Sequence, residues 1–545
     1  MNRRTFLKIA GLGSVSYAFG CSPPPQNLFS QVKTPDDMVA GKATWYASTC
    51  RECPAGCGIL AKNREGRVIK LEGNPFHPIN RGRLCMRGQA ALQGIYNPDR
   101  LKTPLLKENN KWRPLSFSKA ESILKTRARE AAGKGPDRVR MLTETVGDSM
   151  MSLFSSVMQN LKSREPLVFE SFAYESLKTA NEKVFGVNGL VSYHMERADV
   201  LLSFGADFLE TWLSPVEYAR KFKEMHAQHN GRKNLFFQVS PLQSLTGANA
   251  DHWLACKPGS ESVVALGLVR QVLDIGKGRE LPTSYHEFMN KVTAPYTQDQ
   301  VLQRSGIPLE LYEKLIIQLV EARRPLVVGT HTGASDLNGL QTNLAVNLLN
   351  LLLDPQLRLL DFNNRHRVET AAKRSEVLNF FLNMGIDDVD LLMLNNVNPV
   401  FSMPPDSGVK NALARSGAWV VSFSNFLDET SEIADLILPV RMPLETWDEY
   451  SGKQPMVSTL QPAMGKMTRA SHLGDVLLQA GLENDPPARN YKEWLVARLA
   501  EDHGIANEAQ WVGTLQQGGQ FQVVIKTARS SKKLKPEKLA DALGK

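Results

Sequence analysis

Four cysteines constrain this chain more than any other feature of its sequence. Cys50, Cys53 and Cys57 lie on one short loop, and Cys85 follows later, which gives the spacing C-x2-C-x3-C-x27-C. A local triplet plus one distant cysteine lets four soft sulfur ligands converge from different directions, as a cubane cluster requires. Structural zinc is an alternative, but it prefers paired C-x2-C knuckles, and the second half supplies one cysteine. Two disulfides are also possible in an oxidising compartment, although cysteines so close in sequence pair poorly. The spacing favours a [4Fe–4S] cluster.

Residues 1–21 are predicted to be an export signal. Arg3 and Arg4, followed by Thr-Phe-Leu-Lys, are typical of the twin-arginine route, and the apolar stretch after them is too short to span a bilayer. Cys21 resembles a lipoprotein processing site, where the cysteine becomes the lipidated first residue; otherwise cleavage occurs nearby and Cys21 is lost or free. Residues 22–40 read as a Pro-containing linker. We expect a lipid-anchored protein at the periplasmic face of the inner membrane.

Composition and charge exclude several classes of protein. The 545 residues are 42% hydrophobic and 22% charged, as in an ordinary globular protein, and are long enough for three or more domains. Six cysteines are too few for a disulfide scaffold. The formal net charge of +9 is mild for this length, and no dense basic stretch with interleaved aromatic residues occurs, so we expect no nucleic-acid binding.

Apolar runs alternate with amphipathic helical patterns from about residue 105 onward. This alternation predicts an α/β fold with parallel sheets. Helical patterns lie between the runs, for example at 263–273 and 309–322. The predicted strands are 139–142, 200–204, 235–239, 326–329, 391–394 and 419–423. Loops that follow such strands are where parallel sheets bind ligands, and 203–207, 329–333 and 395–399 fit this description.

The cysteine loop and several later motifs together resemble the complex iron–sulfur molybdoenzyme family, also called the DMSO-reductase or molybdopterin oxidoreductase family. The resemblance covers roughly residues 41–480. The matching stretches occur in the family's order. They are Leu84-Cys85-Met86-Arg87-Gly88-Gln89, Ser240-Pro241, Ala250-Asp251-His252-Trp253, Lys257-Pro258-Gly259-Ser260-Glu261, Asn398-Pro399, Pro404-Pro405-Asp406, Asp428-Glu429-Thr430, Ala434-Asp435, Leu438-Pro439 and Glu445.

The resemblance implies a small [4Fe–4S] domain and two interleaved α/β domains around a bis-pterin-guanine-dinucleotide cofactor. We expect the cluster domain at 41–104, one α/β domain at 105–145 and 321–480, the other at 146–320, and an extension with a basic tail at 481–545. The cluster ligands would be Cys50, Cys53, Cys57 and Cys85. The residues implied to contact the cofactor are Arg87, Ser171, Asn398, Pro399, Asp428, Thr430 and Asp435.

Two departures from the family pattern bear on the metal. The stretch 168–176, where the family places its molybdenum ligand, contains no cysteine, and only Ser171 could serve. The C-terminal barrel that closes over the pterins in full members has no counterpart in residues 481–545. We therefore expect molybdenum and its pterin cofactor to be absent and the cluster to remain.

These departures resemble the molybdopterin-like subunits of alternative complex III and of periplasmic menaquinone reductase complexes. Retention of all four cysteines favours the second group. The resemblance implies three partners: a multi-cluster ferredoxin-like subunit, an integral membrane subunit that handles quinone, and a multihaem c-type cytochrome.

Three hypotheses follow for the function. The leading one is a molybdenum-free electron-transfer and scaffold subunit of a quinone-linked respiratory complex. The second is a catalytic molybdenum oxidoreductase that acts on a sulfur compound or an oxyanion, with Ser171 or a water-derived oxygen as the extra ligand. The third is a structural relic without any redox role.

Overall fold

The fold is taken from a computed structural model, which describes residues 41–228, 233–330, 338–386, 388–479 and 488–521 together with the single residues 539 and 543. The predicted signal, the linker, Cys21 and most of the basic tail lie outside the described residues. Among the helices that are described, none has the length and apolar character needed to cross a membrane.

The cysteines lie in a small N-terminal unit built on a three-stranded antiparallel sheet. The hairpin between its second and third strands turns at Glu65-Gly66, as the sequence predicts, because both residues adopt the positive φ that a tight turn requires. One helix follows the sheet and packs on its last strand. The elements are β1 (Thr44–Thr49), β2 (Gly58–Arg64), β3 (Arg67–Gly73) and α2 (Met86–Ile95).

A seven-stranded sheet forms the core of the second unit. Its central strands β16, β15, β6 and β7 run parallel, and antiparallel β4 and β5 close one edge. Its strands, in sheet order, are β5 (Lys111–Pro114), β4 (Leu105–Glu108), β17 (Leu436–Ile437), β16 (Trp419–Ser422), β15 (Leu391–Asn395), β6 (Val139–Thr143) and β7 (Leu167–Val168). The central strands are buried on both faces, which is why their sequences read as continuous apolar runs.

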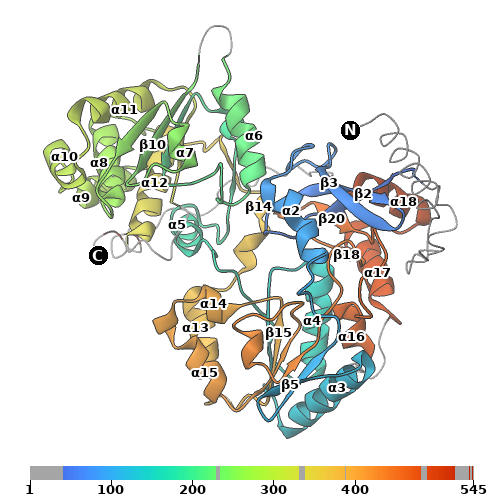
Figure 1. Ribbon diagram of the computed structural model, residues 1–545. Helices are drawn as coiled ribbons and strands as arrows, with labels where there is room; N and C mark the ends of the chain where they lie inside the picture. The colour runs from blue at the N-terminus through green and yellow to red at the C-terminus, as the bar shows by residue number, and fades with distance from the viewer. Residues whose placement is uncertain are drawn as a thin grey trace, which may run out of the picture.

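Helices cover both faces of this sheet, in two separate apolar clusters. One face is covered by α3 (Phe117–Lys134), α4 (Asp148–Asn160), α16 (Leu473–Gln479) and α17 (Tyr491–His503). The other face is covered by α13 (Arg374–Leu382) and α15 (Val409–Arg415), with the short α14 (Pro399–Ser402), η3 (Pro405–Ser407) and η4 (Ser431–Ile433) in the connecting loops. The lower part of Figure 1 shows this unit.

A four-stranded parallel sheet forms the third unit, at the upper left of Figure 1. Its strands, in sheet order, are β11 (His252–Ala255), β10 (Leu235–Ser240), β9 (Val200–Phe204) and β12 (Pro325–Val328). Its helices are α5 (Glu175–Phe185), α6 (Pro215–His226), α7 (Leu245–Ala248), α8 (Glu261–Asp274), α9 (Thr283–Thr293), α10 (Gln298–Ser305), α11 (Leu309–Glu321) and α12 (Gly339–Leu353), with η1 (Met195–Arg197) before β9.

The chain crosses from one of the larger sheets to the other at later residues than the sequence analysis predicts. Strand β7 and helix α4 still belong to the seven-stranded unit, so that unit extends beyond residue 145. Strand β12 pairs with β9, and α12 packs on α8 and α5, so the second crossing comes after residue 353 and not at 321. The apolar run 326–329 would have the same sequence in either sheet. Only its pairing with β9 shows that it belongs to the four-stranded sheet.

The segment after β17 returns to the cysteine unit. Strand β20 packs beside β1, and α18 also contacts β1, so the C-terminal helices lie next to the N-terminal sheet (Figure 1). The remaining elements are β8 (Ser192–Tyr193) with β13 (Leu360–Asp361), β14 (Arg365–His366) with β19 (Lys453–Gln454), η2 (Arg367–Thr370), β18 (Asp448–Glu449) and β21 (Gly519–Gln520) on either side of β20 (Val457–Leu460), and α18 (Glu508–Gln517). The cysteine loop is thereby enclosed by segments about 400 residues away.

Candidate functional site

The cysteine loop is fixed at both ends and clamped from outside. The backbone N–H of Cys50 donates to the carbonyl of Cys57 at 2.8 Å, which closes the loop. Gly56 has a φ of +58°, and a side chain there would also meet the backbone of Gly452. The Tyr450 hydroxyl donates to the carbonyl of Pro54 at 2.9 Å. These contacts hold the backbone of the triplet in place from both sides.

All four cysteine side chains belong to one apolar cluster, and all four are free thiols. Cys50 and Cys57 are buried, whereas Cys53 and Cys85 are half-buried. Burial raises the pKa of Cys50 to about 12, and it raises the pKa values of Cys53 and Cys57 as well. The charge of each neighbouring thiolate raises the pKa of Cys57 further, so the four sulfurs lie within electrostatic range of one another.

These residues fit a [4Fe–4S] cluster. Ionising several buried thiols together is costly without a cation, and iron supplies the missing positive charge. In the described part of the chain, no three Cys, His, Asp or Glu side chains are close enough to hold a single metal ion. Cys85 comes directly before α2, so its sulfur lies at the helix terminus that favours negative charge. The structure thus places the four cysteines that the sequence analysis selects in one apolar cluster, and their role as cluster ligands stays a prediction.

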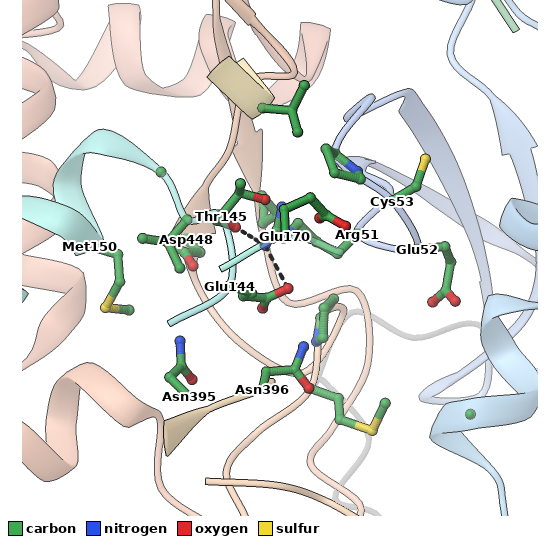
Figure 2. A pocket seen from close by; sticks show the side chains of 18 of the residues that line it. Arg51, Glu52, Cys53, Glu144, Thr145, Met150, Glu170, Asn395, Asn396 and Asp448 are labelled. Carbon is green, nitrogen blue, oxygen red and sulfur yellow. Dashed lines mark hydrogen bonds and ion pairs between the residues drawn. The ribbon is translucent and has the colours of Figure 1, made fainter. Parts of the chain in front are cut away.

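A cavity of about 640 Å³ lies beside the cysteine loop, where the three units meet. Cys53 and Arg87 contribute to its wall from the cysteine unit. The carboxyl ends of parallel strands contribute the opposite side, with Glu144 directly after β6 and Asn395 at the end of β15. This is the edge at which parallel sheets bind ligands. Figure 2 shows Arg51, Glu144, Glu170 and Asp448 gathered in this cavity.

Arg51 connects the cysteine loop to the cavity. Its guanidinium donates to the carbonyl of Thr145 at 2.6 Å and lies 3.3 Å from a carboxylate oxygen of Glu144 (Figure 2). The same guanidinium lies over the Tyr450 ring, 3.7 Å from its centroid. Burial alone opposes the charge of Arg51, but Glu144, Tyr450 and Asp448 together raise its pKa above the ordinary value. The residue beside the first cysteine is therefore an arginine that is only 12% exposed and whose positive charge is favoured by its neighbours.

The cavity wall carries more carboxylates than cations. Glu52, Glu144, Glu170 and Asp448 face Arg51, Arg87 and Arg441. Burial raises the pKa of Asp448 to about 6 and also raises the pKa values of Glu52 and Glu170, and the charge of Glu144 adds to each shift. Asp448 is held by the Tyr491 hydroxyl, which donates to it at 2.7 Å. Burial and the Glu144 charge therefore disfavour the ionised form of these three carboxyl groups.

The structure separates the residues that the resemblance assigns to the cofactor. Arg87 and Ser171 line the cavity. Asn398 and Thr430 do not line it; the Thr430 hydroxyl donates to the Asn398 side chain at 2.7 Å and ties together two loops whose neighbouring residues do line it. Asp428 accepts from the backbone N–H of Thr430 at 3.1 Å and so orders the second loop.

Pro399 and Asp435 are placed away from the cavity. Pro399 is the buried first residue of α14. Asp435 comes directly before β17, at the amino edge of the sheet, where it accepts from the backbone N–H of Val420 at 2.7 Å. Ligands of parallel sheets bind at the opposite edge.

Sequence reasoning missed the polar group formed by Arg51, Glu144 and Asp448. Glu144 follows a predicted strand directly, so the rule that ligands meet strand ends could have identified it. Arg51 gave a weaker signal, as the residue after the first cysteine. Asp448 gave none, because its approach to the cysteine loop depends on a strand pairing far along the chain.

Comparison with known proteins places this site in a family. The family model "Molybdopterin oxidoreductase Fe4S4 domain" matches residues 43–97, and "Molybdopterin oxidoreductase" matches residues 100–470. The chain is 26% identical over 486 residues to the menaquinone reductase, molybdopterin-binding-like subunit, of Nitratidesulfovibrio vulgaris, covering 86% of this chain and 69% of that protein.

Other relatives are molybdopterin-containing subunits of reductases. The thiosulfate reductase molybdopterin-containing subunit of Salmonella typhimurium is 22% identical over 581 residues, covering 95% of this chain and 74% of that protein. Acetylene hydratase from Pelobacter acetylenicus has the same fold, with a TM-score of 0.65, 14% identity, and coverage of 84% of this chain and 72% of that one. The chain therefore belongs to the molybdopterin oxidoreductase family and carries its Fe4S4 domain at the N-terminus.

Proposed function

We propose that this chain is a molybdenum-free electron-transfer and scaffold subunit of a periplasm-facing, quinone-linked respiratory complex. The observation that carries the proposal is the contrast between the two neighbouring sites. The three thiols of the clamped cysteine loop share one apolar cluster with the thiol of Cys85. The cavity beside it offers no cysteine other than Cys53, which belongs to that quartet.

The charge of the cavity wall supports the same conclusion. A bis-pterin-guanine-dinucleotide cofactor carries two pyrophosphate groups, and anions are stabilised by cations and free N–H donors. Here Arg51 is already paired with Glu144, and the carboxylates Glu52, Glu170 and Asp448 are themselves hard to ionise. In this proposal the wall holds no such cofactor, and no step of the proposed function passes through it.

In the proposed role, the chain's own residues hold and connect the redox centre. When bound, the [4Fe–4S] cluster supplies a one-electron couple. Cys50 and Cys57 would hold it from the buried side, whereas Cys53 would face the cavity. The exposed Arg87, in the first turn of α2, places a positive charge within range of Cys53. Electrons would pass between the partner subunits through this side of the molecule.

The partners and the location belong to the proposal. Similarity to a menaquinone reductase subunit supports a membrane complex with a quinone-handling subunit. A multi-cluster ferredoxin-like subunit and a multihaem c-type cytochrome would complete the electron path. Export by the twin-arginine route and lipidation at Cys21 would hold the chain at the periplasmic face of the membrane.

Metal and pterin analysis of the purified chain tests the proposal. We expect about four iron atoms per chain, the content of one cubane, with neither molybdenum nor tungsten and no pterin released by acid oxidation. Stoichiometric molybdenum would overturn the proposal, and absence of iron would overturn the cluster assignment.

A catalytic molybdenum oxidoreductase is the second candidate, because Ser171 is exposed and lines the cavity. This candidate predicts that acid oxidation of the purified chain releases pterin, and that Ser171→Ala abolishes turnover of a sulfur compound or oxyanion.

A structural relic without redox function is distinguished by Cys53→Ser. That substitution should lower quinone turnover of the assembled complex under the leading proposal and leave it unchanged in a relic.

A further inference from the structure

The outer face of the three-stranded sheet in the cysteine unit is open at one end. The inner face packs into the apolar cluster of the cysteines, through residues such as Ile59 and Val68. On the outer face, Trp45 of β1 pairs with Lys62 of β2, and Lys62 pairs with Lys70 of β3. Directly opposite residues share a face of a sheet, so these three side chains form one row. Figure 1 shows β2 and β3 at the edge of the molecule.

Apolar side chains are exposed at the open end. Trp45 is 48% exposed, and the Lys62 ammonium lies 5.5 Å from the centroid of its indole ring. Ile69 is 52% exposed and is skipped in the register between β2 and β3, as the extra residue of a bulge. Ala47, further along β1 on the same face, is buried, and a Cβ at Gly518 would lie 3.2 Å from its side chain. The end of α18 therefore covers one end of this face and leaves the end with Trp45 open.

A second exposed segment adjoins the hairpin of β2 and β3. The Arg67 guanidinium donates to the sulfur of Met467. Lys466 and Arg469, on either side of that methionine, are exposed, and residues 462–470 contain no Asp or Glu. This segment therefore adds positive charge to the edge of the sheet.

The combined surface is basic. Its two carboxylates each lie beside a cation, Glu72 at 2.7 Å from Lys70 and Glu65 at 3.8 Å from Arg64. The cations of the sheet and of the adjoining segment outnumber them; they are Lys42, Lys62, Arg64, Arg67, Lys70, Lys466 and Arg469. We call these cations, together with Trp45 and Ile69, the basic sheet face.

We infer that the basic sheet face docks on an anionic lipid surface. Tryptophan favours the boundary between headgroups and acyl chains, and an exposed isoleucine gains by leaving water there. Lysine and arginine side chains bind lipid phosphates, and each one near an anionic surface raises partitioning about fivefold. Alternation of aromatic, aliphatic and basic side chains on one face is what such a surface requires.

The place of this face in the chain favours a lipid surface as the occupant. Trp45 lies shortly after residues 22–40, which connect the sheet to Cys21. The inference rests on the proposed lipidation of Cys21 and location at the membrane. A chain of that length reaches at most about 65 Å when fully extended, so the anchor holds the face near the membrane and makes docking intramolecular. The anchor alone leaves the orientation free, whereas docking through this face would fix it.

Quenching of tryptophan fluorescence by brominated lipids tests the inference. The full chain is reconstituted on vesicles of brominated phosphatidylcholine, with or without phosphatidylglycerol. We expect quenching that requires phosphatidylglycerol and weakens as the salt concentration rises. Trp45→Phe should remove most of this quenching. Lys62→Gln combined with Lys70→Gln should lower the ratio of docked to undocked chain at least about fivefold.

A tryptophan with the same surroundings in another unit supplies the control. Trp112 of β5 has the Lys107 ammonium 5.3 Å from its ring centroid, and Lys111 is exposed on the same strand. Trp112→Phe should leave the quenching that depends on phosphatidylglycerol unchanged. Lys107→Gln combined with Lys111→Gln should leave it unchanged too.

The outcomes separate docking from the proposed function. Quenching that is independent of phosphatidylglycerol, or that falls equally in the Trp45 and Trp112 variants, would overturn the docking surface. If Trp45→Phe lowers stability, the double lysine variant decides, because both lysines reach solvent. Iron and pterin analysis of the same sample is independent of quenching. A chain that holds its iron without docking overturns only this inference, and a docked chain without iron overturns only the cluster assignment.

Discussion

At the scale of single residues, Arg51 links the cysteine loop to the cavity. Its guanidinium is held by the Thr145 carbonyl, the Glu144 carboxylate and the Tyr450 ring. Replacing it with methionine would remove all three contacts and leave Glu144 unpaired. We expect Arg51→Met to lower the free energy of unfolding by about 2–3 kcal/mol, less than a fully buried pair because Glu144 is partly exposed.

Urea denaturation of the purified chain measures this loss. Arg51→Lys is the matched comparison, and it should recover little stability, since an ammonium cannot stack on the Tyr450 ring and fork to two acceptors as a guanidinium does. Full recovery by lysine would show that charge alone matters at this position.

The raised pKa values of Asp448 and Glu449 predict how the free energy of unfolding changes with pH. Burial raises their pKa values in the folded chain to about 6 and about 7, above the values of about 4 and 4.5 expected when unfolded. Between about pH 4 and pH 7 the folded state thus binds more protons than the unfolded state. The two carboxyl groups therefore contribute fully to the free energy of unfolding in acid, and this contribution is lost as the pH rises. Asp448→Asn should make the decline in unfolding free energy from pH 5 to pH 8 shallower, as denaturation at both pH values would reveal. An unchanged decline would contradict the assignment.

At the scale of elements, the cysteine loop and the segment between β18 and β19 form one packed unit. A side chain at Gly452 would overlap the Ala55 carbonyl, which is backbone and cannot move aside. We expect Gly452→Ala to cost at least about 2 kcal/mol and to lower iron incorporation, because the triplet loop must shift. Calorimetry and iron analysis measure both effects.

Gly513→Ala is the matched control for that substitution. Gly513 lies inside α18 with nothing near its added methyl group, so alanine there should stabilise the chain by about 0.5–1 kcal/mol. Equal effects at the two glycines would show that the close contact with Ala55 is unimportant.

At the scale of the whole molecule, a buried ion pair joins the N-terminal unit to the late part of the chain. Arg100 forks onto Glu445 with distances of 3.1 and 2.6 Å, and both side chains are almost completely buried. Glu445 also accepts from the backbone N–H of Met467 at 2.7 Å and of Met442 at 3.0 Å. One carboxylate therefore orders the end of the cysteine unit and two turns that enclose it.

Breaking this pair should destabilise the entire chain. We expect Glu445→Ala to lower the free energy of unfolding by about 3–5 kcal/mol, because Arg100 would remain buried and unpaired. Arg100→Met combined with Glu445→Leu should cost clearly less, since no uncompensated charge remains. Thermal unfolding compares the variants, and additive losses in the double variant would contradict a coupled pair.

The local features of this protein could be predicted from short stretches of its sequence. The four cysteines, the hairpin at Glu65-Gly66 and the parallel α/β runs depend on residue spacing and periodicity, which neighbouring residues alone specify. The motifs from Leu84 to Glu445 also identified the family, which the comparisons confirm. These features could be predicted because each is encoded within a few tens of residues.

Tertiary structure alone decided which distant segments meet. The apolar run of β12 has the same sequence whichever sheet it joins, and Tyr450 and Gly452 carry no local sign that they approach the cysteine loop. Their positions depend on strand pairings and helix packing between segments hundreds of residues apart. Four cysteines in the sequence thus predict where a cluster binds, and only the folded chain places Arg51 and Cys53 in the wall of one cavity beside it.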